Sequence, residues 1–261
     1  MNINDITITS LETITALDMI GKYLFTLDEL QNATIANTQD TTDITGKQGR
    51  KLAKLKRNKA VTISGTNGML SGGLLEMQTG SAFADKATIV LHTDYLTVAS
   101  NKATTNYTAV GTTGAEIIDV FVRNTDGTPG KTLTQGAEAA DGVFKYTPAS
   151  KELAFTGLDE GAEIVVRYNR KIQASVLTNE SDVYSGKCQL YIDALAEDKC
   201  ANVYHVQFFI PKADFSGEFS IEMGDNQTVH AFEAEALAGA CGAGGNLWTY
   251  TIYGADAKDV A

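Results

Sequence analysis

The chain has 261 residues, a formal net charge of −11 at pH 7 and 43% hydrophobic residues. No apolar run approaches the roughly 20 residues that span a bilayer, so we expect no membrane-spanning helix and no membrane partner. The acidic balance argues against a protein that grips nucleic-acid phosphates over its whole surface, although it suits a conduit that nucleic acid passes without sticking.

Two further features of the whole chain concern its compartment and its cysteines. The first twenty residues lack the basic start and apolar stretch of a secretory signal, so we expect synthesis in a cytoplasm. Cys188, Cys200 and Cys241 are widely spaced and include no Cys-x-x-Cys pair. They therefore predict buried free thiols rather than a disulfide framework or a zinc site.

The first marked feature along the chain is a basic segment. Between Ile44 and Leu75 there are seven basic side chains and no acidic one, although the whole chain carries 32 Asp and Glu. This segregation predicts a surface that docks on an acidic neighbouring copy; phosphate contact and a merely solvated face are the alternatives. No aromatic residue is interleaved for base stacking. The candidate subunit or ring interface consists of Lys47, Arg50, Lys51, Lys54, Lys56, Arg57 and Lys59.

One α-helix is predicted at about residues 68–79. Asn67 can cap its start and Gly80 can end it. The inner Gly72-Gly73 pair lowers helix stability by roughly 1 kcal/mol per residue, which suggests that a backbone or another neighbour comes close. A second helical stretch is expected at Gln48–Lys56, where the apolar face is thin. The candidate packing face of the first helix consists of Met69, Leu70, Leu74, Leu75 and Met77.

Elsewhere the dominant pattern is the period-two alternation of strands with one buried face. Turn chemistry such as Asn124–Gly127 and Asp141-Gly142 separates these runs at short intervals. Many short strands with regular turns predict a mainly β sandwich or barrel. The Thr/Gly/Asn-rich region 100–142 is expected to form loops and hairpins, as a variable insertion in a single domain. Strands are predicted at Thr88–Val98, Val143–Thr147, Glu152–Phe155, Glu163–Ile172, Val203–Ile210, Glu218–Met223 and Leu247–Tyr253.

Motifs for catalysis or cofactor binding are not found in the sequence. His92, His205 and His230 are far apart, and their spacing does not match a metal site. The glycine-rich basic segment lacks the spacing of a phosphate-binding loop. Scattered acidic pairs such as Asp159-Glu160 are interpreted as solvated loop charge. We therefore predict a protein that is not an enzyme and has no catalytic, metal or cofactor site.

The order of segments resembles the major tail tube proteins of long-tailed bacteriophages, especially the non-contractile ones. The resemblance extends along nearly the whole chain and also reaches the tube protein of type VI secretion systems. It rests on order and spacing rather than on one diagnostic motif. The segments are Tyr23–Asp28, Ala33–Ile35, the Thr/Asp loop Thr41–Gly46, the Lys-rich stretch, the strand Ala60–Ser64, the helix ending in Gln78-Thr79-Gly80, and the closing pair His230–Leu237 and Leu247–Tyr253.

The resemblance implies a β-sandwich or half-barrel with one flanking helix. Six copies would share sheets to close a ring around an inner β-barrel, and rings would stack into a tube. An acidic channel would conduct DNA in transit, and the protein would be located in the tail of the virion. The implied partners are copies of the chain itself and other tail proteins: the tape measure, the terminator and the distal tail protein.

Two other classes of function remain open at this point. A decoration, baseplate or adhesin-type module of the virion would share the β-rich composition, with 100–142 as its recognition region. A glycan hydrolase would need converging carboxylates, and the single Trp248 makes an aromatic-lined sugar cleft a weak expectation.

Overall fold

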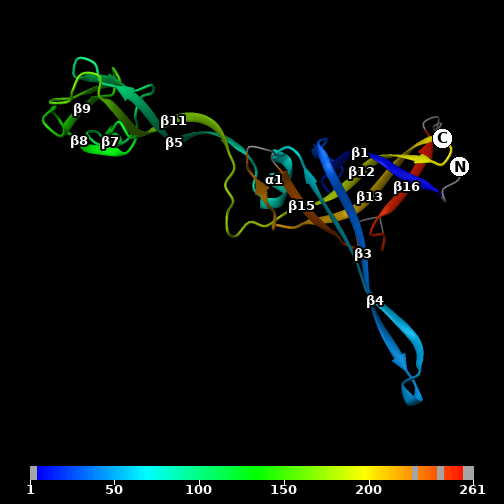
Figure 1. The fold of residues 1–261 in the computed structure, drawn as a ribbon. Coiled ribbons are helices and arrows are strands. Elements are labelled where there is room, and N and C mark those ends of the chain that lie inside the picture. Colours follow the sequence, from blue (N-terminus) through cyan, green and yellow to red (C-terminus); the bar gives the residue numbers. More distant parts are fainter. Residues whose placement is uncertain (1–4, 225–228, 240–243, 255–261) are drawn as a thin grey trace. The chain divides into compact units, whose positions relative to one another are not determined.

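The computed structural model describes residues 5–224, 229–239 and 244–254. The chain is mainly β, as predicted, with two sheets and, in the described part, a single α-helix (Figure 1). It forms two compact units. Unit 1 comprises Met1–Phe83 and Leu177–Ala261, and unit 2 comprises Ala84–Val176.

Unit 1 is built on a curled half-barrel of antiparallel strands. The strand order is β2-β1-β12-β13-β15-β4-β3, with β14 paired to β15 and β16 paired to β13. The strands are β1 (Ile6–Leu17), β2 (Tyr23–Leu27), β3 (Leu30–Thr45), β4 (Lys51–Asn67), β12 (Lys187–Asp198), β13 (Val203–Phe215), β14 (Ile221–Glu222), β15 (Val229–Ala236) and β16 (Thr249–Gly254).

The core of unit 1 lies on one face of this sheet. Alternation along β12 buries Leu190 and Ile192 on the same face as Ile63 of β4 and Phe232 of β15. The α-helix, α1 (Gly72–Thr79), contributes Leu74 to this cluster and so covers that face.

Helix α1 begins later than the sequence predicted. Ser71, not Asn67, is the N-cap, and its hydroxyl accepts a hydrogen bond from the Leu74 N–H at 3.3 Å. Asn67 still belongs to β4, where the side-chain amide donates to the Met69 carbonyl. Gly80 ends the helix in the left-handed conformation, as predicted.

The prediction of a second helix at Gln48–Lys56 is wrong. Lys47–Gly49 forms a single 3-10 turn, η1, and β4 starts at Lys51. Positive φ angles at Gln48 (65°) and Gly49 (73°) reverse the chain, so β4 pairs with β3 and the ladder takes up the backbone hydrogen bonds. The thin apolar face gave a helix nothing to pack against.

Unit 2 contains a second sheet of order β5-β11-β7-β8-β9-β10-β6, in which only β8 and β9 pair in parallel. The region 100–142 lies inside this unit and forms β6, β7 and β8 with their turns. The predicted hairpin around Pro148–Ser150 is confirmed by the pairing of β9 with β10. The strands are β5 (Ala84–Thr97), β6 (Lys102–Thr104), β7 (Ile117–Arg123), β8 (Pro129–Gln135), β9 (Val143–Thr147), β10 (Glu152–Ala154) and β11 (Glu163–Val176).

Smaller differences from the expectations concern the C-terminal strands and the thiols. Of Glu218–Met223, only β14 is paired, and Leu247-Trp248 precede β16. Cys188 is buried as expected, whereas Cys200 is exposed in a turn; Cys241 lies outside the described residues. Among the described residues, no helix combines the length and apolar character that a bilayer crossing requires.

Candidate functional site

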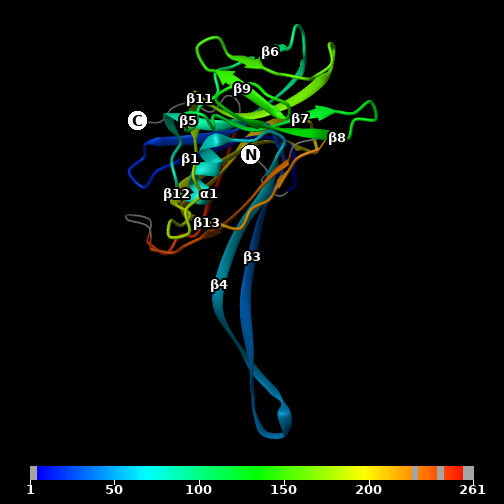
Figure 2. The same cartoon turned by 90° about the vertical axis from the view of Figure 1, so that its left-hand side faces the viewer.

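The basic segment forms the outer part of the long β3–β4 hairpin. At its base, Val61 and Ile63 of β4 are fully buried in the core of unit 1. Beyond Ala60, most residues of both strands are exposed, and the hairpin projects from the unit (Figures 1 and 2). At about 3.3 Å per residue, the stretch from Thr38 to Thr45 extends roughly 25 Å.

Local irregularities separate the base of the hairpin from its outer part. The ladder shifts register between Thr38 and Asp40, where Asn58 takes a positive φ of 49°. The Asn58 side-chain amide donates to Asp40 Oδ2 across the strands at 2.9 Å. Such a bulge bends the strand and increases its twist.

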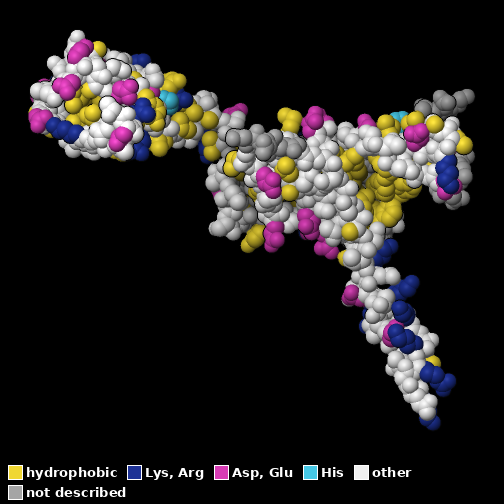
Figure 3. Space-filling view, viewed as in Figure 1, with side chains coloured by type: hydrophobic (Ala, Val, Ile, Leu, Met, Phe, Trp, Pro, Cys, Tyr) yellow, Lys and Arg dark blue, Asp and Glu magenta, His cyan; other side chains and the backbone are white. Residues whose placement is uncertain are grey.

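All seven predicted interface cations are exposed on this hairpin, where Figure 3 shows Lys and Arg along its length. Register and alternation place three lysines on one face: Lys51 opposite Thr45, Lys54 opposite Asp43 and Lys56 opposite Thr41. Lys47 and Arg50 lie at the turn, Lys59 lies at the bulge, and Arg57 lies on the other face opposite Asp40.

Little within the described residues neutralises these charges. Lys51 Nζ lies 2.5 Å from Asp43 Oδ2, an exposed pair worth at most about 1 kcal/mol. The other six cations make no ion pair with any residue of the described part of the chain. The hairpin therefore presents an uncompensated positive surface suited to an acidic partner.

The predicted helix packing face is divided between the core and the surface. Leu74 is fully buried, and Leu75 and Met77 are partly buried. Met69 and Leu70 precede the helix and are exposed, at 60% and 52%. The expected close approach occurs at Gly73, where a Cβ would lie 2.6 Å from Phe25 Cβ.

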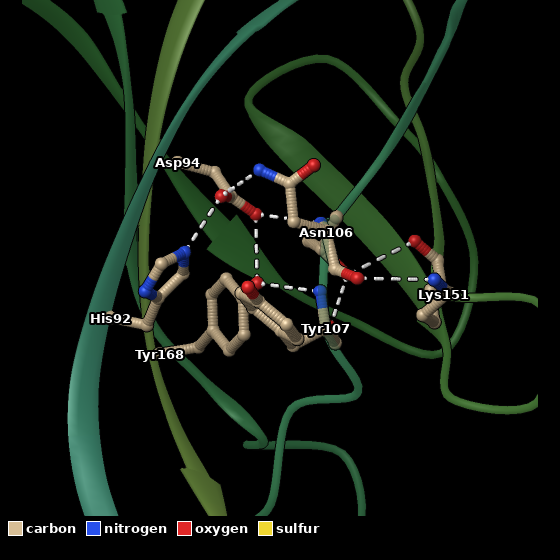
Figure 4. Close-up of polar contacts among 7 residues, drawn as sticks. His92, Asp94, Asn106, Tyr107, Lys151 and Tyr168 are labelled. Carbon is tan, nitrogen blue, oxygen red and sulfur yellow. Dashed lines mark hydrogen bonds and ion pairs between the residues drawn. The ribbon is translucent and has the colours of Figure 1, made fainter.

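A polar cluster in unit 2 joins residues that sequence reasoning left separate (Figure 4). Asp94 is buried and accepts hydrogen bonds from the Asn106 backbone N–H (2.8 Å), the Asn106 side-chain amide (2.5 Å) and the Tyr168 hydroxyl (2.7 Å). His92 Nε2 lies 3.0 Å from the same carboxylate. The Tyr107 N–H donates to the Tyr168 oxygen, which fixes the loop after β6.

The protonation of this cluster follows from its contacts. Burial works to raise the pKa of Asp94, but the hydrogen bonds from Asn106 and Tyr168 and the charge of His92 bring it below its ordinary value of 3.8. Burial, together with the bond to Asp94, raises the pKa of Tyr168 to about 12. A carboxylate that already accepts bonds from Asn106 and Tyr168 is held in a structural role.

His230 on β15 is completely buried. Its Nε2 lies 2.7 Å from Gln78 Oε1, and its Nδ1 lies 3.4 Å from the Ser71 N–H. Burial lowers its pKa, so it is neutral and ties β15 to α1. No cluster of three or more potential metal ligands occurs within residues 5–224, 229–239 and 244–254.

Comparison with known protein families gives a match that extends over both units. The model of the YomU/Tube protein family matches residues 7–249. No curated protein matches the chain.

Proposed function

The chain belongs to the YomU/Tube protein family, and we propose that it is the structural subunit of a bacteriophage tail tube. In this proposal it is a component of the virion tail and has no catalytic role. The observation that carries the proposal is the combination of a curled half-barrel with a projecting basic hairpin, because both features are incomplete in a single copy.

The half-barrel leaves two strand edges open. Within residues 5–224, 229–239 and 244–254, β2 and β3 are the terminal strands of the sheet, and β3 pairs only with β4. Open edges invite pairing, and pairing the edges of successive copies head to tail closes a ring. We propose hexameric rings with an inner β-barrel, as the resemblance to tail tube proteins implies, and an acidic channel for DNA. Residues 84–176 would be an insertion in one tube domain.

The hairpin would connect neighbouring copies or stacked rings. An isolated two-stranded hairpin is at best marginally stable in water, so contact with a neighbour would stabilise its outer part. Its cations would meet an acidic surface, since the whole chain has a net charge of −11. The tape measure, terminator and distal tail proteins of a long-tailed, siphovirus-like phage would be the further partners.

Electron microscopy of the purified protein tests the proposal directly. Negative-stain images over a range of protein and salt concentrations should contain rings or hollow tubes, with contacts weakened by salt because the cations are exposed. Uniform small particles under every condition, also after addition of the partner tail proteins, would contradict it.

A charge-reversal variant tests the hairpin separately. Lys54→Glu with Lys56→Glu should leave the fold intact and reduce assembly, because neither lysine has an ion-pair partner in the described chain. Lys86→Glu with Lys171→Glu, on the β5–β11 ladder, is the matched control with the same change in charge. Equal assembly of both variants would show that the hairpin cations are not an interface.

A further inference from the structure

Unit 1 contains an apolar hollow beside the open edges of its half-barrel. Its volume is about 550 Å³, within the range of roughly 300–1,000 Å³ that holds a compact ligand. Figure 3 shows apolar side chains gathered beside the base of the hairpin. The hollow is lined mainly by Ile8, Leu11, Ile35, Ile192, Phe208 and Trp248.

The strands around this hollow are only partly paired. β2 pairs with β1 only from Ile14 to Leu17, so among the described residues the first half of β1, which carries Ile8, has one open edge. Across the hollow, β3 also has an open edge. The Trp248 indole N–H donates to Asn37 Oδ1 at 3.2 Å, which leaves an apolar ring face in the lining. Ile8 is 52% exposed, so the hollow is open to a partner.

The same unit carries an apolar projection, the β1–β2 knob, formed by Met19, Ile20 and Tyr23. Their exposed fractions are 38%, 90% and 60%. None of the three lines the hollow. Figure 2 shows the β1–β2 turn projecting from unit 1.

The knob is held in one conformation by its turn. Asp18 Oδ1 accepts hydrogen bonds from the backbone N–H groups of Ile20 (2.9 Å) and Lys22 (2.8 Å). The Asp18 N–H donates to the Lys22 carbonyl at 2.7 Å, and Gly21 takes the positive φ of 89° that the turn requires. A rigid turn loses little conformational entropy when its apolar residues are buried by a partner.

We propose that the β1–β2 knob of one copy inserts into the apolar hollow of a second copy. This inference rests on the proposed function and names the contact through which copies associate. Because knob and hollow are separate surfaces of one unit, the contact is head to tail, the type that closes rings or extends filaments. Burial of apolar area drives the insertion.

The area of the contact identifies it as an anchor within a larger interface. A buried aromatic side chain such as Tyr23 covers about 150–250 Å², whereas a stable interface buries about 1,200–2,000 Å² in total. The open β3 edge, which borders the hollow, provides backbone groups for the rest. A second copy is therefore a better occupant than a small apolar molecule, which would leave both edge and knob exposed.

The fluorescence of Trp248 can be used to detect whether the hollow is occupied, because Trp248 is the only tryptophan of the chain and lines the hollow. Its emission should shift to shorter wavelength as the wild-type protein assembles with rising concentration. Ile20→Asp should raise the concentration needed for this shift by about tenfold or more. Met223→Asp, at a residue 86% exposed and outside the hollow, is the matched control and should behave as wild type.

Cysteine crosslinking identifies the two surfaces in contact. In a Cys200→Ser, Cys241→Ser background, Ile20→Cys and Ile8→Cys proteins are mixed and mildly oxidised. The mixture should give a disulfide-linked dimer in excess of either protein alone and of the control mixture of Met223→Cys with Ile8→Cys.

The outcomes separate this inference from the proposed function. Rings or tubes without the Trp248 shift and without the crosslink would overturn knob insertion and leave the tube proposal standing. The shift and the crosslink without rings or tubes, also after addition of the partner tail proteins, would support insertion and contradict the tube. Absence of assembly, shift and crosslink would overturn both.

Discussion

At the scale of single residues, the hydrogen-bond partners around a buried polar group determine what that group does in the fold. Tyr168 is 74 residues from Asp94 in sequence and Asn106 is 12, yet their hydrogen bonds to Asp94 hold the loop after β6 against β5 and β11. Arg170 adds to this anchor, since its guanidinium carbon lies 3.7 Å from the ring centre of Tyr107. Loss of one buried partner leaves the others unsatisfied, which costs more than the bond itself.

Asp94→Asn should therefore destabilise the protein by about 2–3 kcal/mol, measured by urea unfolding at pH 7. The low pKa of Asp94 in the folded protein contributes stability above its ordinary value of 3.8, and this contribution is lost as pH falls through the lowered pKa. The variant should lack that acid-dependent step. Glu138→Gln, which removes an exposed partner of Lys145, should change stability by at most about 1 kcal/mol.

His230 should make unit 1 sensitive to mild acid. Its pKa in the folded protein lies below the ordinary 6.5, so the unfolded chain takes up a proton more readily. Stability is therefore fully kept above pH 6.5 and is lost as pH falls below that value. Thermal unfolding should begin a few degrees lower at pH 5.5 than at pH 7.5.

Two variants check the assignment to His230. His230→Gln should remove most of this pH dependence, although the midpoint of thermal unfolding of this variant at pH 7.5 will also be lower than that of the wild type. His205→Gln, at an exposed histidine of β13, should retain it. An unchanged pH dependence in the His230 variant would assign the effect to other groups.

At the scale of elements, close packing stabilises the base of the β3–β4 hairpin, whereas exposed charged residues characterise its outer part. β4 is held between β3 and β15 at its base, and Gly65 allows this because a Cβ there would lie 2.5 Å from the Asn32 carbonyl oxygen and 2.7 Å from the Phe232 ring. Farther out, β3 and β4 pair only with each other among the residues that the structure describes. We therefore expect contacts with neighbouring copies to form at the outer part of the hairpin.

Gly65→Ala should destabilise unit 1 by about 1–3 kcal/mol, because the added methyl group meets backbone and a packed ring. Chemical unfolding measured by circular dichroism is a suitable assay. Gly224→Ala, where the added Cβ would meet nothing within 4 Å, is the control and should be close to neutral. A neutral Gly65 variant would mean that β3 and β15 can separate without loss of stability.

At the scale of the whole molecule, unit 2 is one continuous segment whose ends meet. Ala84 and Val176 are register partners at the end of the β5–β11 ladder, so the chain leaves unit 1 and returns to it at neighbouring positions. Unit 2 also has its own core, around Val120, Phe144, Leu153 and Tyr168. We therefore expect each unit to fold on its own.

Replacing residues 84–176 by a short Asn-Gly turn should yield a folded unit 1, because Ala84 and Val176 are register partners and the two chain ends to be joined are therefore neighbours. If unit 2 is an insertion, the shortened protein should still form rings or tubes in negative-stain images. The isolated segment 84–176 should unfold cooperatively and give a β-type circular dichroism spectrum. Loss of folding in both pieces would show that the units depend on each other.

The sequence by itself determined the features that depend on local pattern. Alternation of polar and apolar residues predicted strands such as Val203–Ile210, and glycine and proline predicted the turns between strands. The basic segment predicted an exposed surface. Side-chain periodicity and charge can be recognised in the sequence without knowledge of the fold. The order of segments also resembles that of tail tube proteins, in agreement with the family match over residues 7–249.

Only the tertiary structure decided which segments meet. Gln48–Lys56 forms a turn and a strand because β3 pairs with that strand. Asp94 contacts Tyr168 because the β5–β11 ladder brings the two residues together. The hollow around Trp248 depends on strands far apart in the chain. Such convergence comes from long-range pairing, whose register and partners are not encoded in any one segment.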